Sequence, residues 1–230
     1  MRLARDRIEA ALVAHLERVD AGLLTIVIRQ AGLAREIAAG LADAMTKRRA
    51  HRSCDAIALS KRAQLIEEKA DRIIVEARSE IARFDANRRI EGLANQIEDA
   101  IDELEQAAFV ASLVPAELPQ ALLDSLTELC AAAVAGAEAA VTGAAAAAEV
   151  PEGHRVDIED ALAAVGQLAD CEHRGDAAER AMTASIISGA FDLKTALSVL
   201  ELARALERAT DQLARFGHLL REHVLADLSA

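Results

Sequence analysis

The stretch "IEGLANQIEDAIDEL", residues 90–104, decides the fold class, because its apolar side chains recur every three or four residues. The apolar positions are Ile90, Leu93, Ala94, Ile97, Ile101 and Leu104. This period places them on one face of an α-helix. The same periodicity recurs along the chain, few segments alternate at period two, and good helix formers such as Ala, Leu, Glu and Arg dominate. The sequence therefore predicts an all-α protein.

Helical periodicity and its interruptions predict six long antiparallel helices. We expect them at about residues 4–46, 53–84 with Ser53 as N-cap, 88–113, 118–148 and 157–187 with Asp157 as N-cap, followed by a sixth helix that ends near residue 225. The interruptions are "DAN" (85–87), "VPAELP" (114–119), "EVPEGH" (149–154) and "SGAFD" (188–192).

The "VPAELP" segment is the strongest of these breaks, because its two prolines restrict the backbone and end helices. It divides the chain into halves with three predicted helices each. We therefore predict two tandem three-helix bundles, residues 1–114 and 120–230, joined by a linker at residues 115–119.

Charge and composition narrow the choice of partner. The chain carries a net charge of −12, has no Trp or Tyr, and is 53% hydrophobic, so its core must be aliphatic. An acidic surface repels the phosphates of nucleic acids. The one compact basic cluster, "KRRAHR" (residues 47–52), is typical of a solvated helix end. The sequence predicts no nucleic-acid partner and favours cations instead.

The three cysteines, Cys54, Cys130 and Cys171, are far apart and form no C-x-x-C pair. This spacing predicts buried free thiols in a reducing compartment rather than disulfides or a thiolate zinc site. The N-terminal segment lacks the apolar core of a signal peptide. Residues 130–148 are mostly Ala and Gly, which makes them too weakly apolar for a convincing membrane span. We expect a cytoplasmic protein without membrane insertion.

Acidic residues recur in the pattern Glu-x-x-x-Asp. The four pairs are Glu67/Asp71, Glu98/Asp102, Glu172/Asp176 and Glu207/Asp211. From the first half of the chain to the second, the two pairs shift by 105 and 109 residues, so their register is kept to within four residues. This agreement predicts a duplicated domain.

Two carboxylates four residues apart point the same way on a helix and repel each other by a few tenths of a kcal/mol. A cation between them relieves this repulsion, and hard cations prefer carboxylate oxygens. With no thiolate in the pattern, the pairs favour iron, manganese, magnesium or zinc. Polar contacts between helices and ordinary surface charge are the two alternative interpretations.

The segments that carry these pairs resemble the repeated signatures of PhoU-like proteins, in particular the short branch encoded near low-affinity phosphate permeases. They are "LIEEKADRI" (65–73), "RRIEGLANQIEDAIDELEQAA" (88–108), "CEHRGDAAERAM" (171–182) and "ALERATDQLARFGHLL" (205–220). The resemblance spans nearly the whole chain and implies tandem three-helix bundles with surface iron or zinc sites, with magnesium, manganese or nickel as other options. It implies one metal site at Glu67, Asp71, Glu98 and Asp102, a second at Glu172, Asp176, Glu207 and Asp211, and outer ligands at Glu68 and Asp99.

The resemblance also implies a function: a non-enzymatic regulator of phosphate transport or signalling. Such a protein would be a homo-oligomer that binds a phosphate permease or an associated sensor, and it would reach the membrane only through that partner. The sequence departs from the family at "ANRRI" (86–90), where Arg88 and Arg89 replace acids and are expected to weaken or neutralise the first site.

A metal-free helical adaptor, whose acids pair with Arg and Lys, is the alternative function. An enzyme is disfavoured by three absences from the sequence. It contains no Glu-x-x-His motif of the di-iron oxidases, no Gly-rich phosphate loop and no G-x-S-x-G elbow.

Overall fold

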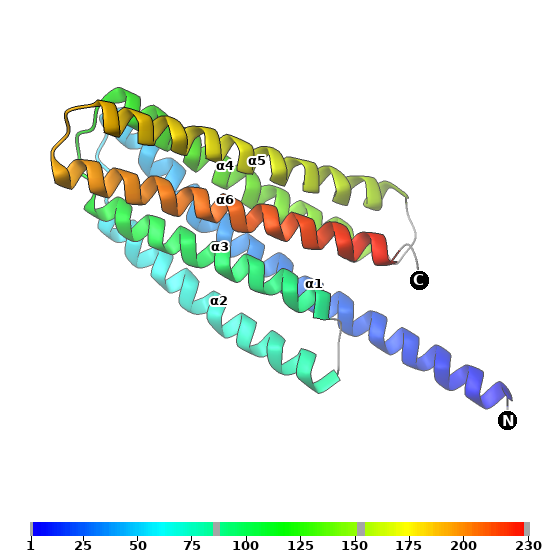
Figure 1. Ribbon diagram of the computed structural model, residues 1–230. Coiled ribbons are helices and arrows are strands. Elements are labelled where there is room, and N and C mark those ends of the chain that lie inside the picture. The colour runs from blue at the N-terminus through cyan, green and yellow to red at the C-terminus, as the bar shows by residue number, and fades with distance from the viewer. Residues whose placement is uncertain (1, 85–87, 151–154, 228–230) are drawn as a thin grey trace.

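In the computed structural model, the described part of the chain forms six α-helices (Figure 1). The structure describes the backbone of residues 2–84, 88–150 and 155–227, and the side chains of residues 20–79, 89–150 and 155–226. The helices are α1 (Arg2–Arg49), α2 (Ala56–Phe84), α3 (Arg88–Leu113), α4 (Gln120–Glu149), α5 (Arg155–Ser188) and α6 (Leu193–Asp227). No strand occurs in this described part of the chain, which confirms the predicted all-α class.

Most helix ends lie within a few residues of their predicted positions, but both predicted N-caps were wrong. α2 begins directly after Asp55, whose carboxylate accepts a hydrogen bond from the Ala58 N–H at 2.9 Å. Asp55 therefore caps α2 in place of Ser53. Asp157 lies inside the first turn of α5, where its negative charge favours the helix dipole but does not start the helix.

The breaks at residues 114–119 and 188–192 are confirmed. After the second break, Asp192 caps α6 by accepting a hydrogen bond from the Thr195 N–H at 3.0 Å. The break predicted at residues 85–87, and residues 151–154 of the break before α5, lie outside the described residues.

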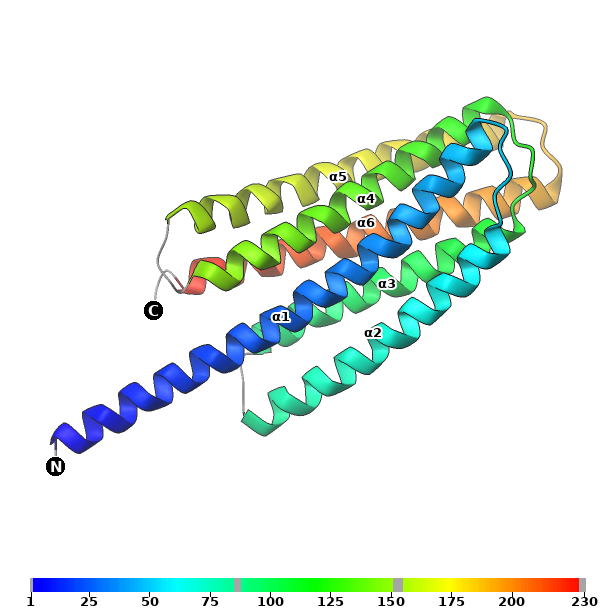
Figure 2. The ribbon, with the colours of Figure 1, turned by 180° about the vertical axis from the view of Figure 1, so that it is seen from behind.

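α1, α3, α4 and α6 occupy the middle of the molecule, with α2 and α5 on opposite flanks (Figures 1 and 2). α2 packs against α1 and α3, whereas α5 packs against α4 and α6. One apolar core includes side chains from all six helices, among them Ile37, Ile74, Ile97, Leu168 and Leu213. Because α1 packs against α4 and α3 against α6, this core continues from the first half of the chain into the second.

α4 packs unusually closely against its neighbours, because its buried face consists largely of Ala and Gly. At Gly143 a Cβ atom would lie 2.9 Å from the Ala164 Cβ of α5 and 2.8 Å from the Leu220 Cδ2 of α6. By length and composition alone α4 could cross a membrane, but more than half of its most apolar stretch is buried among the other helices.

We predict opposite effects for alanine at two helical glycines. Gly143→Ala should lower the free energy of unfolding by about 1–2 kcal/mol, because the new methyl group meets the backbone-anchored Ala164 Cβ. Gly166→Ala should raise it by about 0.5–1 kcal/mol, because its Cβ enters open space and the helix gains propensity. Urea unfolding of both variants checks this, and a Gly143→Ala protein as stable as the wild type would contradict the close packing of α4.

The end of α3 is held by a side chain from α1. The half-buried Arg48 guanidinium donates hydrogen bonds to the carbonyl oxygens of Ala111 at 3.0 Å, Pro115 at 2.9 Å and Val114 at 3.4 Å. The last carbonyls of a helix have no partner within the helix itself. Arg48 therefore caps α3 and ties the α3–α4 connection to the end of α1.

Arg48→Ala should lower the free energy of unfolding by about 2 kcal/mol, because partly buried carbonyl groups lose a charged donor. Its neighbour Arg49 provides the control, since it makes an exposed ion pair to Asp124 at 3.0 Å. Arg49→Ala should cost about 0.5 kcal/mol or less. Equal losses in the two variants, measured by denaturant unfolding, would show that the cap is unimportant.

Candidate metal centres

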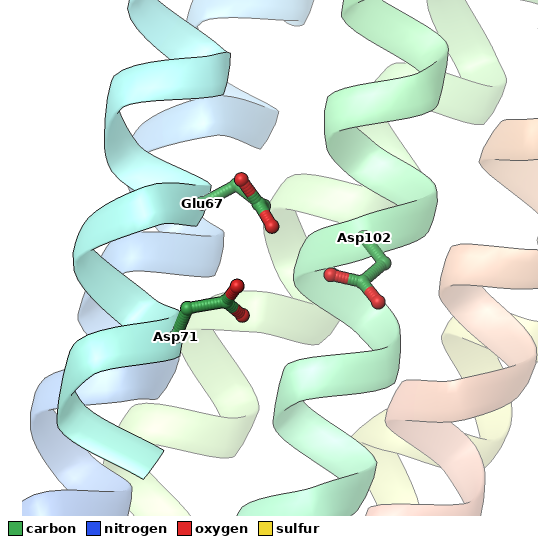
Figure 3. A group of neighbouring side chains, drawn as sticks. All are labelled: Glu67, Asp71 and Asp102. Carbon is green, nitrogen blue, oxygen red and sulfur yellow. The ribbon is translucent and has the colours of Figure 1, made fainter. Parts of the chain in front are cut away.

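Carboxylates from α2 and α3 converge on one spot. Glu67 and Asp71 point from α2 towards Asp102 on α3 (Figure 3). Each of the three provides a carboxylate oxygen, and these oxygens all lie within 4.8 Å of one another. We call these three residues the first acidic group. The helical spacing puts the two α2 acids on one face, and the α2–α3 contact brings Asp102 opposite them.

An equivalent group joins α5 and α6. Glu172 and Asp176 of α5 and Asp211 of α6 provide carboxylate oxygens that also lie within 4.8 Å of one another. These three residues form the second acidic group. In both groups the second helix of the half, counted along the chain, provides a Glu and an Asp, and the third helix provides an Asp.

Close contact between α5 and α6 explains how the second group forms. Gly175 precedes Asp176, Thr210 precedes Asp211, and a Cβ on Gly175 would lie only 2.6 Å from the Thr210 Oγ1. The missing side chain therefore lets the two helices approach beside their acids. In the first half the residues preceding the two aspartates, Ala70 and Ile101, are likewise buried.

Two of the eight predicted ligands do not join the groups. Glu98 forms an ion pair with Arg78 at 2.8 Å, and the same guanidinium nitrogen donates to the Asn95 side chain at 3.0 Å. Glu207 lies beside the second group. The pKa of its carboxyl is raised first by burial, then by the charge of Asp211 and then by that of Asp176.

The predicted outer ligands lie outside both groups as well. Glu68 is exposed. The exposed Asp99 accepts a hydrogen bond from the Gln96 amide at 3.1 Å.

The first acidic group carries uncompensated negative charge. Partial burial of its carboxyl, followed by the charges of Glu98 and Asp71, raises the pKa of Asp102 from 3.8 to about 6, although the residue as a whole is exposed. Burial and then the neighbouring Asp71 and Asp102 raise the pKa of Glu67. Within the described part of the chain, none of the three acids has an ion-pair partner. Asp102 and Glu67 therefore hold their protons more tightly than free carboxylic acids do, and a bound cation would favour their charged forms.

Basic side chains accompany the second acidic group. Arg180 lies 2.6 Å from Asp176, and Arg215 lies 3.7 Å from Asp211. The His173 Nδ1 lies 2.7 Å from a Glu172 oxygen and also 2.7 Å from the Ala169 carbonyl oxygen.

The two arginines follow their aspartates by four residues, and this spacing is the signal that could have identified them from the sequence. At the matching places in the first half, four residues after Asp71 and Asp102, the chain has Val75 and Gln106. Among the described side chains, arginines therefore partly neutralise the second group, and none neutralises the first.

The arginines that were expected to neutralise the first site are poorly placed to do so. Arg89 precedes Asp102 by 13 residues, which corresponds to about 20 Å along a helix. That distance is too long for a direct ion pair. The side chain of Arg88 lies outside the described residues.

Comparisons with known proteins identify no family for this chain. No protein-family model matches the chain, and no curated protein sequence matches it at a significant level.

The raised pKa of Asp102 predicts an unusual dependence of stability on pH in metal-free protein. The native state holds this proton more tightly than the unfolded chain, so stability should rise as the pH falls from 7 to 5. Solvent screens part of the effect at this exposed side chain, and we expect a gain of about 1 kcal/mol. Urea unfolding at both pH values, in the presence of a chelator, measures it.

Asp102→Asn should be more stable than the wild type at pH 7 and should show a clearly smaller gain, because the contribution of Asp102 is gone while Glu67 still titrates. Glu68→Gln, an exposed change outside the acidic groups, should keep the wild-type response. An Asp102→Asn protein that retains the full pH response would contradict the assigned electrostatics.

Proposed function

We propose that this protein is a metal-binding regulatory protein without enzymatic activity, in which each acidic group holds a cation. The observation that carries the proposal is the equivalence of the two groups. The same three positions, Glu-x-x-x-Asp on one helix and Asp on the next, come within 4.8 Å of one another in both halves of the chain. Unrelated surface acids have no reason to cluster twice in one arrangement.

The chemistry of the groups supports hard or borderline cations. Each group presents three carboxylates and no thiolate, which suits iron or zinc, with magnesium, manganese or nickel as alternatives. Burial and then neighbouring acids raise the pKa of Asp102 and Glu67, and a bound cation would favour the charged forms of both. Three protein ligands leave room for water or further oxygen ligands in the coordination shell.

We further propose that the fold is an arrangement of two three-helix bundles, residues 1–114 and 120–230, linked by residues 115–119. The duplicated acidic groups support this division, because each group lies between the second and third helices of its half. The quoted motifs then support a PhoU-like role: a cytoplasmic homo-oligomer that regulates phosphate transport by binding a phosphate permease or an associated sensor, without contacting nucleic acid.

A metal-free adaptor is the second candidate function, and specific contacts favour it. Arg180 pairs with Asp176, Arg215 with Asp211, and Arg78 with Glu98. In this alternative, arginine side chains rather than a metal ion offset the negative charge of the acids. It accounts for the second acidic group better than for the first, whose acids have no such partner in the described part of the chain.

Elemental analysis of protein purified without a His tag tests the choice. We expect Asp71→Ala and Asp211→Ala each to remove about half of the bound metal, and the double variant to remove nearly all of it, because ligand loss abolishes one centre at a time. Glu68→Ala and Asp170→Ala are matched controls, since both residues are exposed acids beside a group and contribute no ligand to it.

Unchanged metal content in both single variants refutes metal binding by these groups. A melting temperature and an oligomeric state that do not respond to a chelator favour the adaptor.

A further inference from the structure

A second kind of site lies at the end of the bundle where α1 turns into α2. A cavity of about 680 Å³ opens between this turn and the α3–α4 connection. Three basic side chains, Arg48, His51 and Arg52, lie on the side of the turn, and apolar Leu118 and Leu123 lie on the other. Neither acidic group contributes to this cavity, so its role is separate from metal binding.

The charge of the cavity is opposite to that of the protein. The chain has a net charge of −12, yet the lining contains three basic side chains and one acid, Glu117. Arg48 is committed to the end of α3. His51 and Arg52 are exposed, and in the described part of the chain their side chains have no hydrogen-bond or ion-pair partner. Two potential donors are therefore free at a cavity wall.

The backbone adds an independent observation, because His51 has a φ of 54°, in the left-handed region. The turn is a Schellman motif, in which the His51 N–H donates to the Arg48 carbonyl at 3.0 Å and the Arg52 N–H donates to the Lys47 carbonyl at 2.8 Å. Glycine adopts this conformation with least strain and is the usual residue there. A histidine held in that conformation at a cavity wall is the kind of local strain that marks functional positions.

We propose that this cavity binds a small organic anion. Arg52 and His51 donate hydrogen bonds to its phosphate or carboxylate group, and Leu118 and Leu123 contact its apolar body. The volume is within the usual range for small-molecule sites. Guanidinium groups recognise both kinds of anion through charge-assisted hydrogen bonds.

Titration calorimetry with phenyl phosphate, benzoate and inorganic phosphate tests the proposal. We expect phenyl phosphate or benzoate to bind, and the tighter of the two identifies the anionic group. Inorganic phosphate should bind more weakly than phenyl phosphate, because it has no apolar body. Arg52→Ala should weaken binding about tenfold or more through loss of a charged donor. Glu117→Gln should strengthen it, because the one carboxylate on the lining is removed.

His51→Gly separates binding from folding. It should raise the melting temperature, because glycine relieves the left-handed strain, and still weaken binding of the probe. Cys54 gives a second readout, since it lines the cavity and is partly exposed whereas Cys130 and Cys171 are buried. A bound probe should slow its alkylation by iodoacetamide.

Arg221→Ala, at an exposed arginine on α6 outside the cavity lining, is the control and should bind the probe as the wild type does. The proposal is overturned if neither organic probe binds, or if Arg52→Ala and His51→Gly both bind with wild-type affinity.

Discussion

The contact between neighbouring helices of each half is the constraint on which the candidate centres depend. Carboxylates repel, so three of them stay within 4.8 Å of one another only if the backbone fixes their positions. Here apolar packing does so. Gly175 fits against Thr210 directly beside Asp176 and Asp211, and both Gly175 and Thr210 are buried. The stability of the core holds the acids in an arrangement that they would not adopt on their own.

The two halves share the geometry of the three acids but differ in the basic side chains that offset their negative charge. Arg180 and Arg215 lie four residues after the aspartates of the second acidic group, whereas Val75 and Gln106 occupy these places in the first. The second group thus resembles an ordinary network of ion pairs more than the first does. A cation should matter most at the first group, where burial and like charges already raise the pKa of Asp102. From the sequence, Arg88 and Arg89 at the start of α3 were expected to make the first site the weaker of the two, which is the opposite ranking.

The sequence predicts those features that depend on neighbours along the chain. Apolar periodicity located all six helices, and the prolines located the main break. The spacing of four residues identified the acids that meet. This spacing failed for Glu98, which forms an ion pair with Arg78 instead. Arg78 precedes it by twenty residues and lies on another helix, so no local sequence pattern contains that contact. Ser53 and Asp55 are both good capping residues, so propensity alone could not choose between them.

Anomalous diffraction from crystals grown with Mn²⁺ tests the central claim most directly, because it locates the cation without any substitution. The account predicts two peaks, one among the carboxylates of Glu67, Asp71 and Asp102 and one among those of Glu172, Asp176 and Asp211, at about 2.0–2.6 Å from the oxygens. Both acidic groups without a peak, in crystals where Mn²⁺ binds elsewhere on the protein, would contradict it.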